Sequence, residues 1–242
     1  MKIAVYTAIF NATNPIDKPG TFQKLPGVDY FLFTNLDPKI FNNTSWTVKQ
    51  VPIPLEHIPK QDDKRKYIYC NRYYKWHPHI VLAEYDIIMY IDGFQIPDAS
   101  KHEAWYRMFT MLYQNPSIYL VANPHPTCKC AYREAEMVVI CKKDDPLRMD
   151  ILTDYFSSLQ FPKDYGLFWN GCFIFKNTPK KTNPIAAVYA SLWDDMVKFT
   201  YRDQPLFMVN IWKNNARGFI AIADLETMVR NVDSNHNHVY IN

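Results

Sequence analysis

The chain has 242 residues, of which 48% are hydrophobic and 21% are charged, and its formal net charge is +3. This length suits one α/β domain with a sizeable core, so we expect a single domain over residues 1–242. The composition is that of a globular protein and excludes a disordered or fibrous chain. The net charge is small and the Lys and Arg residues are scattered, which argues against a nucleic-acid partner.

The cysteines and the apolar runs indicate in which compartment the protein is expected. The chain contains five Cys, and the C-x-C pair of Cys128 and Cys130 has no second pair at the spacing of metal ligands. This pattern argues against a disulfide framework and against a structural zinc site. We find no convincing signal peptide and no apolar run of about 18 residues that would predict a membrane span. We therefore expect a cytoplasmic protein without a transmembrane segment.

Apolar, β-branched runs alternate along the chain with longer stretches of helical character. We expect strands at residues 2–10, 28–35, 46–51, 85–92, 117–122 and 171–176. We expect helices at 64–82 with an interruption at Pro78, and at 100–114, 144–159, 184–198 and 203–214. This alternation predicts an α/β fold with a Rossmann-like, mixed but mostly parallel central sheet flanked by helices.

The strand at residues 85–92 ends in Asp92, which Gly93 follows. Open α/β sheets bind ligands beyond the carboxyl ends of their strands. A carboxylate at such a position suits a Mg²⁺ or Mn²⁺ ion that neutralises a diphosphate leaving group. The alternative is that Asp-Gly is only the turn that closes an apolar strand. A lone Asp-Gly does not decide between the two.

Six segments in order carry a resemblance to a known family. They are residues 5–10, 71–79, 85–93, His125 with 130–135, 166–175 and 201–207. Together they resemble small GT-A glycosyltransferases of plants, bacteria and large DNA viruses, long described as a domain of unknown function and distantly similar to glycogenin and galactosyltransferases. The resemblance implies the GT-A fold. It also implies transfer of a hexose or deoxyhexose from a nucleoside-diphosphate sugar, preferably a UDP-sugar, to a carbohydrate or glycoconjugate acceptor.

The resemblance also implies which residues bind the donor. They are Tyr6, Thr7, Ala8, Arg72, Lys75, Asp92 and Gly93. The first three end the opening strand, where such folds receive the nucleobase and ribose, although an ordinary buried strand end has the same pattern. Arg72 and Lys75 lie three residues apart and would share a helix face, from which they could clamp phosphate. Solvated surface cations are the alternative.

The implied metal site departs from the family pattern. Asp92 matches the first carboxylate of an Asp-x-Asp-like element, but Phe94 stands where a second Asp or Asn is expected. One carboxylate gives little affinity for Mg²⁺ or Mn²⁺ unless other ligands join it. His236 and His238 are candidates, since related enzymes carry a late His ligand, and imidazole favours Mn²⁺. A polar, frayed tail is the alternative.

Catalytic and acceptor-binding residues follow from the same resemblance. Asp203 and Gln204 resemble an Asp-Gln pair beside the transferred sugar, where a carboxylate could hold hydroxyls or accept the acceptor's proton. An Asp also suits the first turn of a helix. Glu134 is a second candidate base, or else part of a polar helix face. Sugar and acceptor contacts are assigned to His125, Asn170, Gly171 and Arg202, with turn chemistry as the alternative for the middle two.

Two other classes of function remain open. Phe94 in the metal element suggests a non-catalytic nucleotide- or carbohydrate-binding module derived from such an enzyme. A sugar-phosphate nucleotidyltransferase also needs a strand-end carboxylate. The chain has only 6 Gly and no Gly-rich phosphate loop, which counts against the nucleotidyltransferase.

Overall fold

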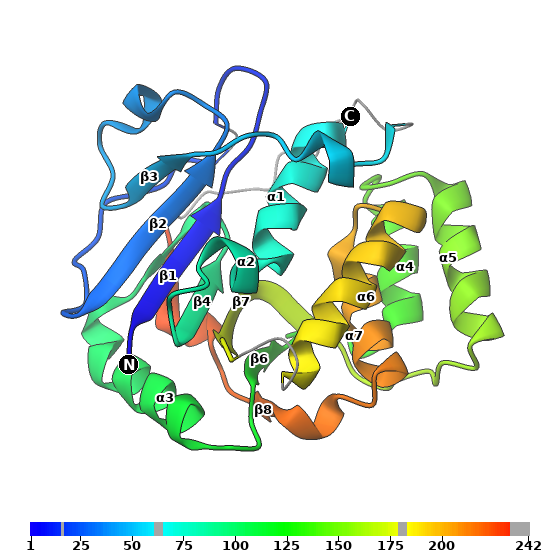
Figure 1. Cartoon of the computed structure of the whole chain (residues 1–242). Helices are drawn as coiled ribbons and strands as arrows, with labels where there is room; N and C mark the ends of the chain where they lie inside the picture. The colour runs from blue at the N-terminus through cyan, green and yellow to red at the C-terminus, as the bar shows by residue number, and fades with distance from the viewer. Residues whose placement is uncertain (16, 61–64, 179–182, 233–242) are drawn as a thin grey trace.

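A computed structural model describes residues 1–15, 17–60, 65–178 and 183–232 of the chain (Figure 1). Its strands are β1 (Ile3–Ala8), β2 (Val28–Thr34), β3 (Thr47–Gln50), β4 (Ile87–Ile91), β5 (Gln95–Pro97), β6 (Leu120–Pro124), β7 (Phe168–Lys176), β8 (Ile220–Ile222) and β9 (Val229–Asn231). Its α-helices are α1 (Lys66–Trp76), α2 (Pro78–Val81), α3 (His102–Gln114), α4 (Ala131–Ile140), α5 (Pro146–Ser158), α6 (Pro184–Lys198) and α7 (Asp203–Lys213).

The described strands form a seven-stranded sheet in the order β3-β2-β1-β4-β7-β6-β8 and a small sheet of β5 with β9. Within the large sheet β7 runs antiparallel to β4 and β6, and every other neighbouring pair is parallel. The fold is therefore α/β, with a mixed, mostly parallel central sheet flanked by helices. The predicted fold class is confirmed.

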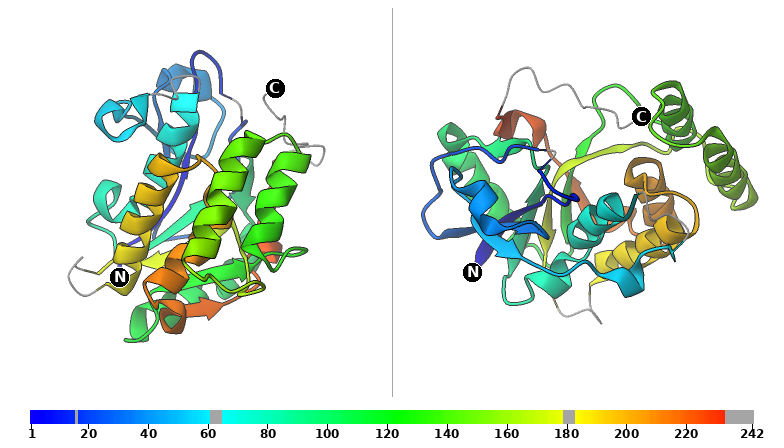
Figure 2. Two further views of the ribbon diagram at one scale, coloured as in Figure 1. Left: turned by 90° about the vertical axis from the view of Figure 1, so that its right-hand side faces the viewer. Right: turned by 90° about the horizontal axis from the view of Figure 1, so that it is seen from above.

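Both faces of the sheet are covered, and this is why the central strands are apolar throughout. In β1 all six residues are buried, and successive side chains enter different layers of the core. Ile3 and Val5 pack in the layer that contains α3, whereas Ala4 and Tyr6 pack in the layer that contains α1 and α4 to α7. Figure 1 shows α3 on one side of the sheet and α6 and α7 on the other, and Figure 2 shows the two layers from further directions.

The predicted elements agree with the described ones apart from some boundaries, one helix that was not predicted and several short strands. Pro78 interrupts the helix predicted at residues 64–82, as expected. The helix α1 ends at Trp76, and a separate helical turn, α2, begins at the proline. The long strand β7 begins at Phe168, three residues before the expected start at 171. The sequence did not predict α4 as a defined helix, nor β5, β8 and β9. The last three span three residues each, too few to show a period of two.

The antiparallel direction of β7 positions the residues that matter for function. Because β7 runs against β4, the first residues of β7 lie where β4 ends. The backbone N–H of Asp92 donates to the carbonyl of Gly171 at 2.9 Å. Asn170 is thereby placed beside the strand-end carboxylate, although 78 positions separate them in the chain. Among the described residues no helix is both long enough and apolar enough to cross a bilayer.

A candidate active site at the strand ends

A cavity of about 1100 Å³ opens where β4 ends and β7 begins. Ten of the residues predicted from the sequence lie in its wall: Arg72, Lys75, Asp92, His125, Glu134, Asn170, Gly171, Arg202, Asp203 and Gln204. They come from α1, α4, α7, the end of β4, the start of β7 and the segment after β6. The fold therefore gathers the predicted catalytic, acceptor and phosphate-binding positions into one place.

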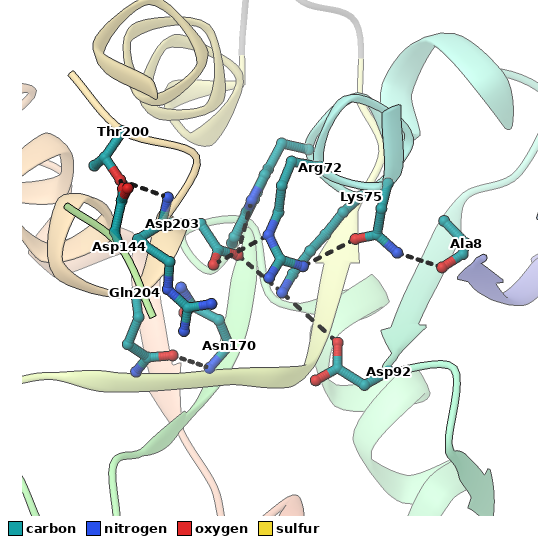
Figure 3. A network of polar contacts seen from close by, with 12 residues as sticks. Ala8, Arg72, Lys75, Asp92, Asp144, Asn170, Thr200, Asp203 and Gln204 are labelled. Atoms are coloured by element: carbon teal, nitrogen blue, oxygen red, sulfur yellow. Dashed lines mark hydrogen bonds and ion pairs between the residues drawn. The ribbon is translucent and has the colours of Figure 1, made fainter. Parts of the chain in front are cut away.

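Two cations of α1 converge on one carboxylate (Figure 3). The Nζ atom of Lys75 lies 2.9 Å from Asp203 Oδ2 and 3.8 Å from Asp92 Oδ1. The Nε atom of Arg72 lies 3.4 Å from Asp203 Oδ1. Lys75 is only 2% exposed, so this charge is removed from water almost completely. The prediction that Arg72 and Lys75 share a helix face is confirmed, and the solvated alternative is wrong for both.

Burial and charge act in opposite directions on this network. Burial would raise the pKa of Asp203, but the neighbouring charges of Arg72 and Lys75 hold it well below its usual value. Burial lowers the pKa of Lys75, and the carboxylates of Asp203 and Asp92 compensate only in part. For Arg72 the lowering by burial is outweighed by Asp203, and its pKa is raised. Asp203 is thus ionised at neutral pH and is poorly suited to accept a proton, because a general base needs a pKa near the working pH.

Asp203 lies at a helix start, as one of the two interpretations of the sequence predicted, and its place beside the transferred sugar stays a prediction. It is the first residue of α7, where the helix macrodipole favours a negative charge. Its Oδ2 atom also accepts a hydrogen bond from the indole Nε1 of Trp76 at 3.1 Å. Trp76 is fully buried and stacks on Phe173 of β7, so its donor is fixed in place. The Asp203 carboxylate is therefore held by three side chains of α1, those of Arg72, Lys75 and Trp76, and it is favoured by the N-terminus of its own helix.

Asp92 is the more accessible carboxylate of the site. Its side chain is 24% exposed, and its Oδ1 atom accepts a hydrogen bond from Tyr90 at 2.9 Å. The described part of the chain contains no group of three His, Cys, Asp or Glu residues that could hold a metal ion. With Lys75 beside it, Asp92 does not by itself fit a divalent cation. His236 and His238 lie outside the described residues, so their metal role stays a prediction.

The start of β7 contributes an amide without partners. Asn170 is 3% exposed, and neither its Oδ1 nor its Nδ2 atom has a hydrogen-bond partner in the described structure. Because buried polar groups are normally satisfied, this amide keeps hydrogen-bonding capacity that the described residues do not use. The neighbouring Gln204 differs, since its Oε1 accepts from the Asn170 backbone at 3.3 Å and its Nε2 donates to the Phe168 carbonyl. Gln204 thus anchors β7 to α7.

Gly171 has a steric reason to be glycine. A Cβ atom at this position would overlap with the indole of Trp169, which lies across the glycine and forms part of the cavity wall. The backbone carbonyl of the same glycine accepts the hydrogen bond from Asp92. The glycine therefore lets an aromatic wall and a strand-end carboxylate approach each other closely.

A second polar group lies in the cavity wall around Glu134 of α4. Burial raises the pKa of Glu134, and the charges of Arg202 and Lys143 offset that rise only in part. Burial and the charge of Lys143 lower the pKa of His125. The His125 Nδ1 atom accepts the backbone N–H of Cys128 at 3.0 Å, which assigns the proton of the neutral ring to Nε2. Of the two carboxylates predicted as bases, Glu134 is the one whose pKa is raised, whereas that of Asp203 is lowered.

The predicted donor residues of β1 are placed differently. Tyr6, Thr7 and Ala8 are fully buried and, like Gly93, do not line the cavity. The Tyr6 hydroxyl donates to the Lys75 carbonyl at 2.5 Å, so it holds the end of α1. The Ala8 carbonyl accepts from the amide of Asn71, a neighbour of Arg72 in α1. These residues position the cations, and their contact with a nucleotide stays a prediction.

Sequence reasoning missed several residues of the cavity wall. They are Asn11, Arg65, Tyr67, Ile68, Val139, Lys142, Lys143, Asp144, Asp145, Pro146, Trp169 and Tyr201. Most of them lie at the ends of helices or in the turns between them, where no periodicity marks an inward side chain. Trp169 could have been predicted from the sequence, because it directly precedes the predicted pair of Asn170 and Gly171.

No known family profile matches this sequence, and no curated protein matches it. Solved structures with a similar fold include mouse xyloside xylosyltransferase 1 in its apo form, at 10% identity and a TM-score of 0.48, with 91% of this chain and 84% of that chain covered. They also include the mannosyltransferase Ktr4p from S. cerevisiae, at 9% identity and a TM-score of 0.47, with 86% of this chain and 65% of that chain covered. Similarity at this level does not indicate which reaction this chain catalyses.

Proposed function

We propose that this chain is a glycosyltransferase that moves a hexose or deoxyhexose from a nucleoside-diphosphate sugar, preferably a UDP-sugar, to a carbohydrate or glycoconjugate acceptor. One observation carries the proposal. The buried Lys75 and the half-buried Arg72 meet Asp92 and Asp203 in a large cavity at the carboxyl ends of parallel strands. Ligands of open α/β sheets bind at this edge.

The cations suit the leaving group of such a reaction. Glycosyl transfer breaks the bond between the anomeric carbon and the diphosphate, which departs with additional negative charge. Arg72 and Lys75 are fixed beside that position by Asp203, so they can stabilise the developing charge without first reorganising. Arg offers a planar fork to phosphate and Lys a point charge. A divalent cation, Mn²⁺ in preference to Mg²⁺, would add neutralising charge, with Asp92 and the predicted His236 or His238 as its protein ligands.

The unsatisfied amide of Asn170 supports a sugar as the transferred group. A buried amide without partners favours a ligand that offers both donors and acceptors, and sugar hydroxyls do so. Such a site also discriminates against ligands that lack the hydroxyl, because the amide would then stay unpaired. Asn170 lies in the same cavity wall as Lys75 and Asp92, where the sugar next to the diphosphate would lie.

Glu134 is the base that we assign to the acceptor hydroxyl. Its pKa is raised by burial, which brings a carboxylate closer to the pH at which proton transfer is efficient. Asp203 takes the other role considered for it, because it is paired with two cations and held well below its usual pKa. It orients Arg72 and Lys75 and remains available to sugar hydroxyls.

Calorimetry with nucleoside diphosphates tests whether the chain binds the proposed donor. The protein is titrated with UDP, GDP and ADP, each with and without Mn²⁺, and release of free sugar from the matching nucleotide sugars is then followed. We expect one diphosphate to bind best and its sugar conjugate to be hydrolysed slowly. Absence of binding by all three diphosphates under both conditions would overturn the proposal. Release of pyrophosphate from a nucleoside triphosphate and a sugar phosphate would instead indicate a nucleotidyltransferase.

A further inference from the structure

The chain contains six tryptophans, and Trp169 differs from the other five. Each of the others packs against an aromatic ring of the protein: Trp46 against Tyr30, Trp76 against Phe173, Trp105 against Phe109, Trp193 against Tyr69 and Trp212 against Phe161. Trp169 has no such ring neighbour among the described residues. It is half-buried, and of the six it alone lines the cavity. The cavity wall therefore contains a large aromatic surface that no other ring of the described protein covers.

The course of β7 explains why this indole reaches the cavity. Where β7 pairs with β6, the register jumps from Phe173 to Trp169 at neighbouring residues of β6. Residues 170–172 of β7 are left without a partner in β6 and form a bulge. Bulges disturb the alternation of side chains between the two faces of a sheet and re-aim them, often next to active sites. The consecutive residues 169–171 can all line the cavity for this reason.

The fold holds the indole of Trp169 in place. The ring lies across Gly171, where any Cβ atom would overlap with it. Trp169 also packs against the hydrophobic core of the layer that contains α3. One part of the ring is therefore fixed by the protein, and the rest borders the cavity. A ligand that packs on a fixed side chain does not have to order it first, which favours affinity.

A flat apolar surface beside polar groups suits a sugar ring. A pyranose presents C–H groups on its face and hydroxyls around its edge, so it needs an apolar contact and hydrogen bonds together. The indole of Trp169 offers the apolar contact. The amide of Asn170, which has no partner among the described residues, belongs to the same bulge. Asp92 is close as well, since its backbone N–H donates to the Gly171 carbonyl at 2.9 Å.

A nucleobase is the other flat ring that a nucleotide sugar contains. The sequence predicts that the base and ribose lie at the end of β1, and in the sheet β4 separates β1 from β7. Neighbouring strands are about 4.8 Å apart, so the backbone of β7 lies roughly 10 Å to the side of β1. This separation places Trp169 beside the sugar rather than beside the base.

We propose that Trp169 is a stacking platform for a sugar ring, either the transferred sugar of the donor or the acceptor sugar that receives it. The proposal rests on the proposed function, because it adds a sugar contact at that same site. The apolar face of the pyranose lies against the indole, and its hydroxyls meet the polar groups of the bulge. Both sources of the ring share this chemistry, and the ligands used in the test distinguish them.

Tryptophan fluorescence and calorimetry test the proposal. The wild-type protein is titrated with UDP and GDP, with UDP-glucose, UDP-galactose and GDP-mannose, and with the free disaccharides lactose, maltose and cellobiose. We expect at least one sugar-containing ligand to change the fluorescence more than the bare diphosphates do, because Trp169 is the one tryptophan in the cavity wall. If no sugar-containing ligand binds or changes the fluorescence, the proposal is wrong.

Three variants locate the effect. Trp169→Ala should weaken binding of the sugar ligand about tenfold, because stacking of a flat ring on an aromatic side chain contributes on this scale. Trp169→Phe keeps an aromatic ring, so it should retain most of the affinity while the fluorescence change is lost. Trp212→Phe removes a half-buried tryptophan outside the cavity wall and should alter neither quantity. Urea midpoints show whether each variant is folded.

The ligand that loses affinity in Trp169→Ala identifies the source of the ring. A loss for nucleotide sugars but not for UDP or GDP assigns the platform to the donor sugar, and a loss for the disaccharides assigns it to the acceptor. Unchanged affinity for every sugar ligand, or an equal loss for the bare diphosphates, would overturn the proposal. Failure of the wild type to bind any nucleoside diphosphate would count against the proposed function, while the disaccharides still decide whether Trp169 binds a sugar.

Discussion

The two parts of the cavity contain the same kinds of side chain but use them differently. At the strand ends Asp203 lies within 3.4 Å of both Arg72 and Lys75, and both Asp203 and Lys75 are removed from water. Beside α4, Glu134 faces Arg202 without an ion pair in the described structure. Charges that are already paired give a rigid, preorganised site for a group that is always bound in the same way. The charge of Glu134 is instead offset only in part, by cations that lie further away.

The difference follows from the elements that carry these residues. Arg72 and Lys75 extend from a helix that packs on the sheet, and the indole of Trp76 is fully buried next to them. Lys143 lies in the turn after α4 and Arg202 directly before α7, so neither is carried by a helix that packs on the sheet. Substitutions in the first part should therefore affect folding and function together. Substitutions in the second part should affect function more than folding.

The largest effect is expected for Asp203→Asn. The change leaves Lys75 buried without its closest counter-charge, and breaking a buried pair costs about 3–5 kcal/mol of stability. Urea unfolding measures the loss. Asp194→Asn, at an exposed position on α6, is the matched control and should change the stability by no more than about 0.5 kcal/mol. A loss of stability below about 1 kcal/mol for Asp203→Asn would show that the ion pair of Asp203 with Lys75 behaves like an exposed one and does not make this part of the cavity rigid.

Protonation of Asp203 at low pH should lower the stability of the wild type, as the Asp203→Asn substitution does. The pKa of Asp203 is lowered in the folded protein, so its contribution to stability is present above the unfolded value of about 3.9 and is lost as the pH falls through and below it. The stability difference between wild type and Asp203→Asn should therefore shrink as the pH is lowered below about 4. Urea unfolding at pH 7, 5 and 3 measures it. A difference that stays constant over this range would contradict the ion-pair account.

Asp92→Asn should reduce turnover rather than stability. Asp92 lies at the edge of the network, with its side chain 24% exposed and 3.8 Å from Lys75. Asp92 is the proposed ligand of the divalent cation that would neutralise the leaving diphosphate, and loss of such charge stabilisation typically costs about 100-fold or more in rate. Hydrolysis of the preferred nucleotide sugar measures it, with Asp194→Asn again as the control. Unchanged turnover would remove Asp92 from the site, and the absence of turnover in the wild type would favour a binding module.

Gly171→Ala separates packing from charge at the strand ends. The added methyl group would displace the Trp169 indole, and such overpacking costs about 1–3 kcal/mol. Gly218→Ala is the matched control, because a Cβ at that glycine meets no atom within 4 Å. Urea unfolding and tryptophan fluorescence follow both variants. Equal stability of the two would show that the aromatic wall is adaptable.

The smallest effect is expected in the pH dependence of transfer. Glu134 has a raised pKa and acts as a base only when deprotonated, so kcat/KM should fall on the acid side with an apparent pKa above the ordinary Glu value of about 4.3. Glu134→Gln should remove this acid limb and lower the rate, while its urea midpoint stays close to that of the wild type. A variant that keeps the acid limb would assign the base to another group.

The order of strands and helices could largely be predicted from the sequence. The buried strand at residues 85–92 and the helix face of Arg72 and Lys75 depend on local periodicity, which burial imposes on each element separately. The helix start at Asp203 has an equally local cause. Strands of three residues, such as β5 (Gln95–Pro97), were not predicted, because they are too short to show an alternation of buried and exposed side chains.

The pairing of these elements was decided only by the tertiary structure. Whether Arg72 and Lys75 face solvent or a carboxylate depends on where α7 begins in space, and the sequence does not contain that distance. The antiparallel direction of β7 brings Asn170 beside Asp92, and the turn after α4 brings Lys143 into the same cavity wall as Glu134. The sequence alone determined the chemical groups, the local elements and the strand-end position of Asp92. The tertiary structure decided which charges neutralise one another, because that choice depends on contacts between segments far apart in the chain.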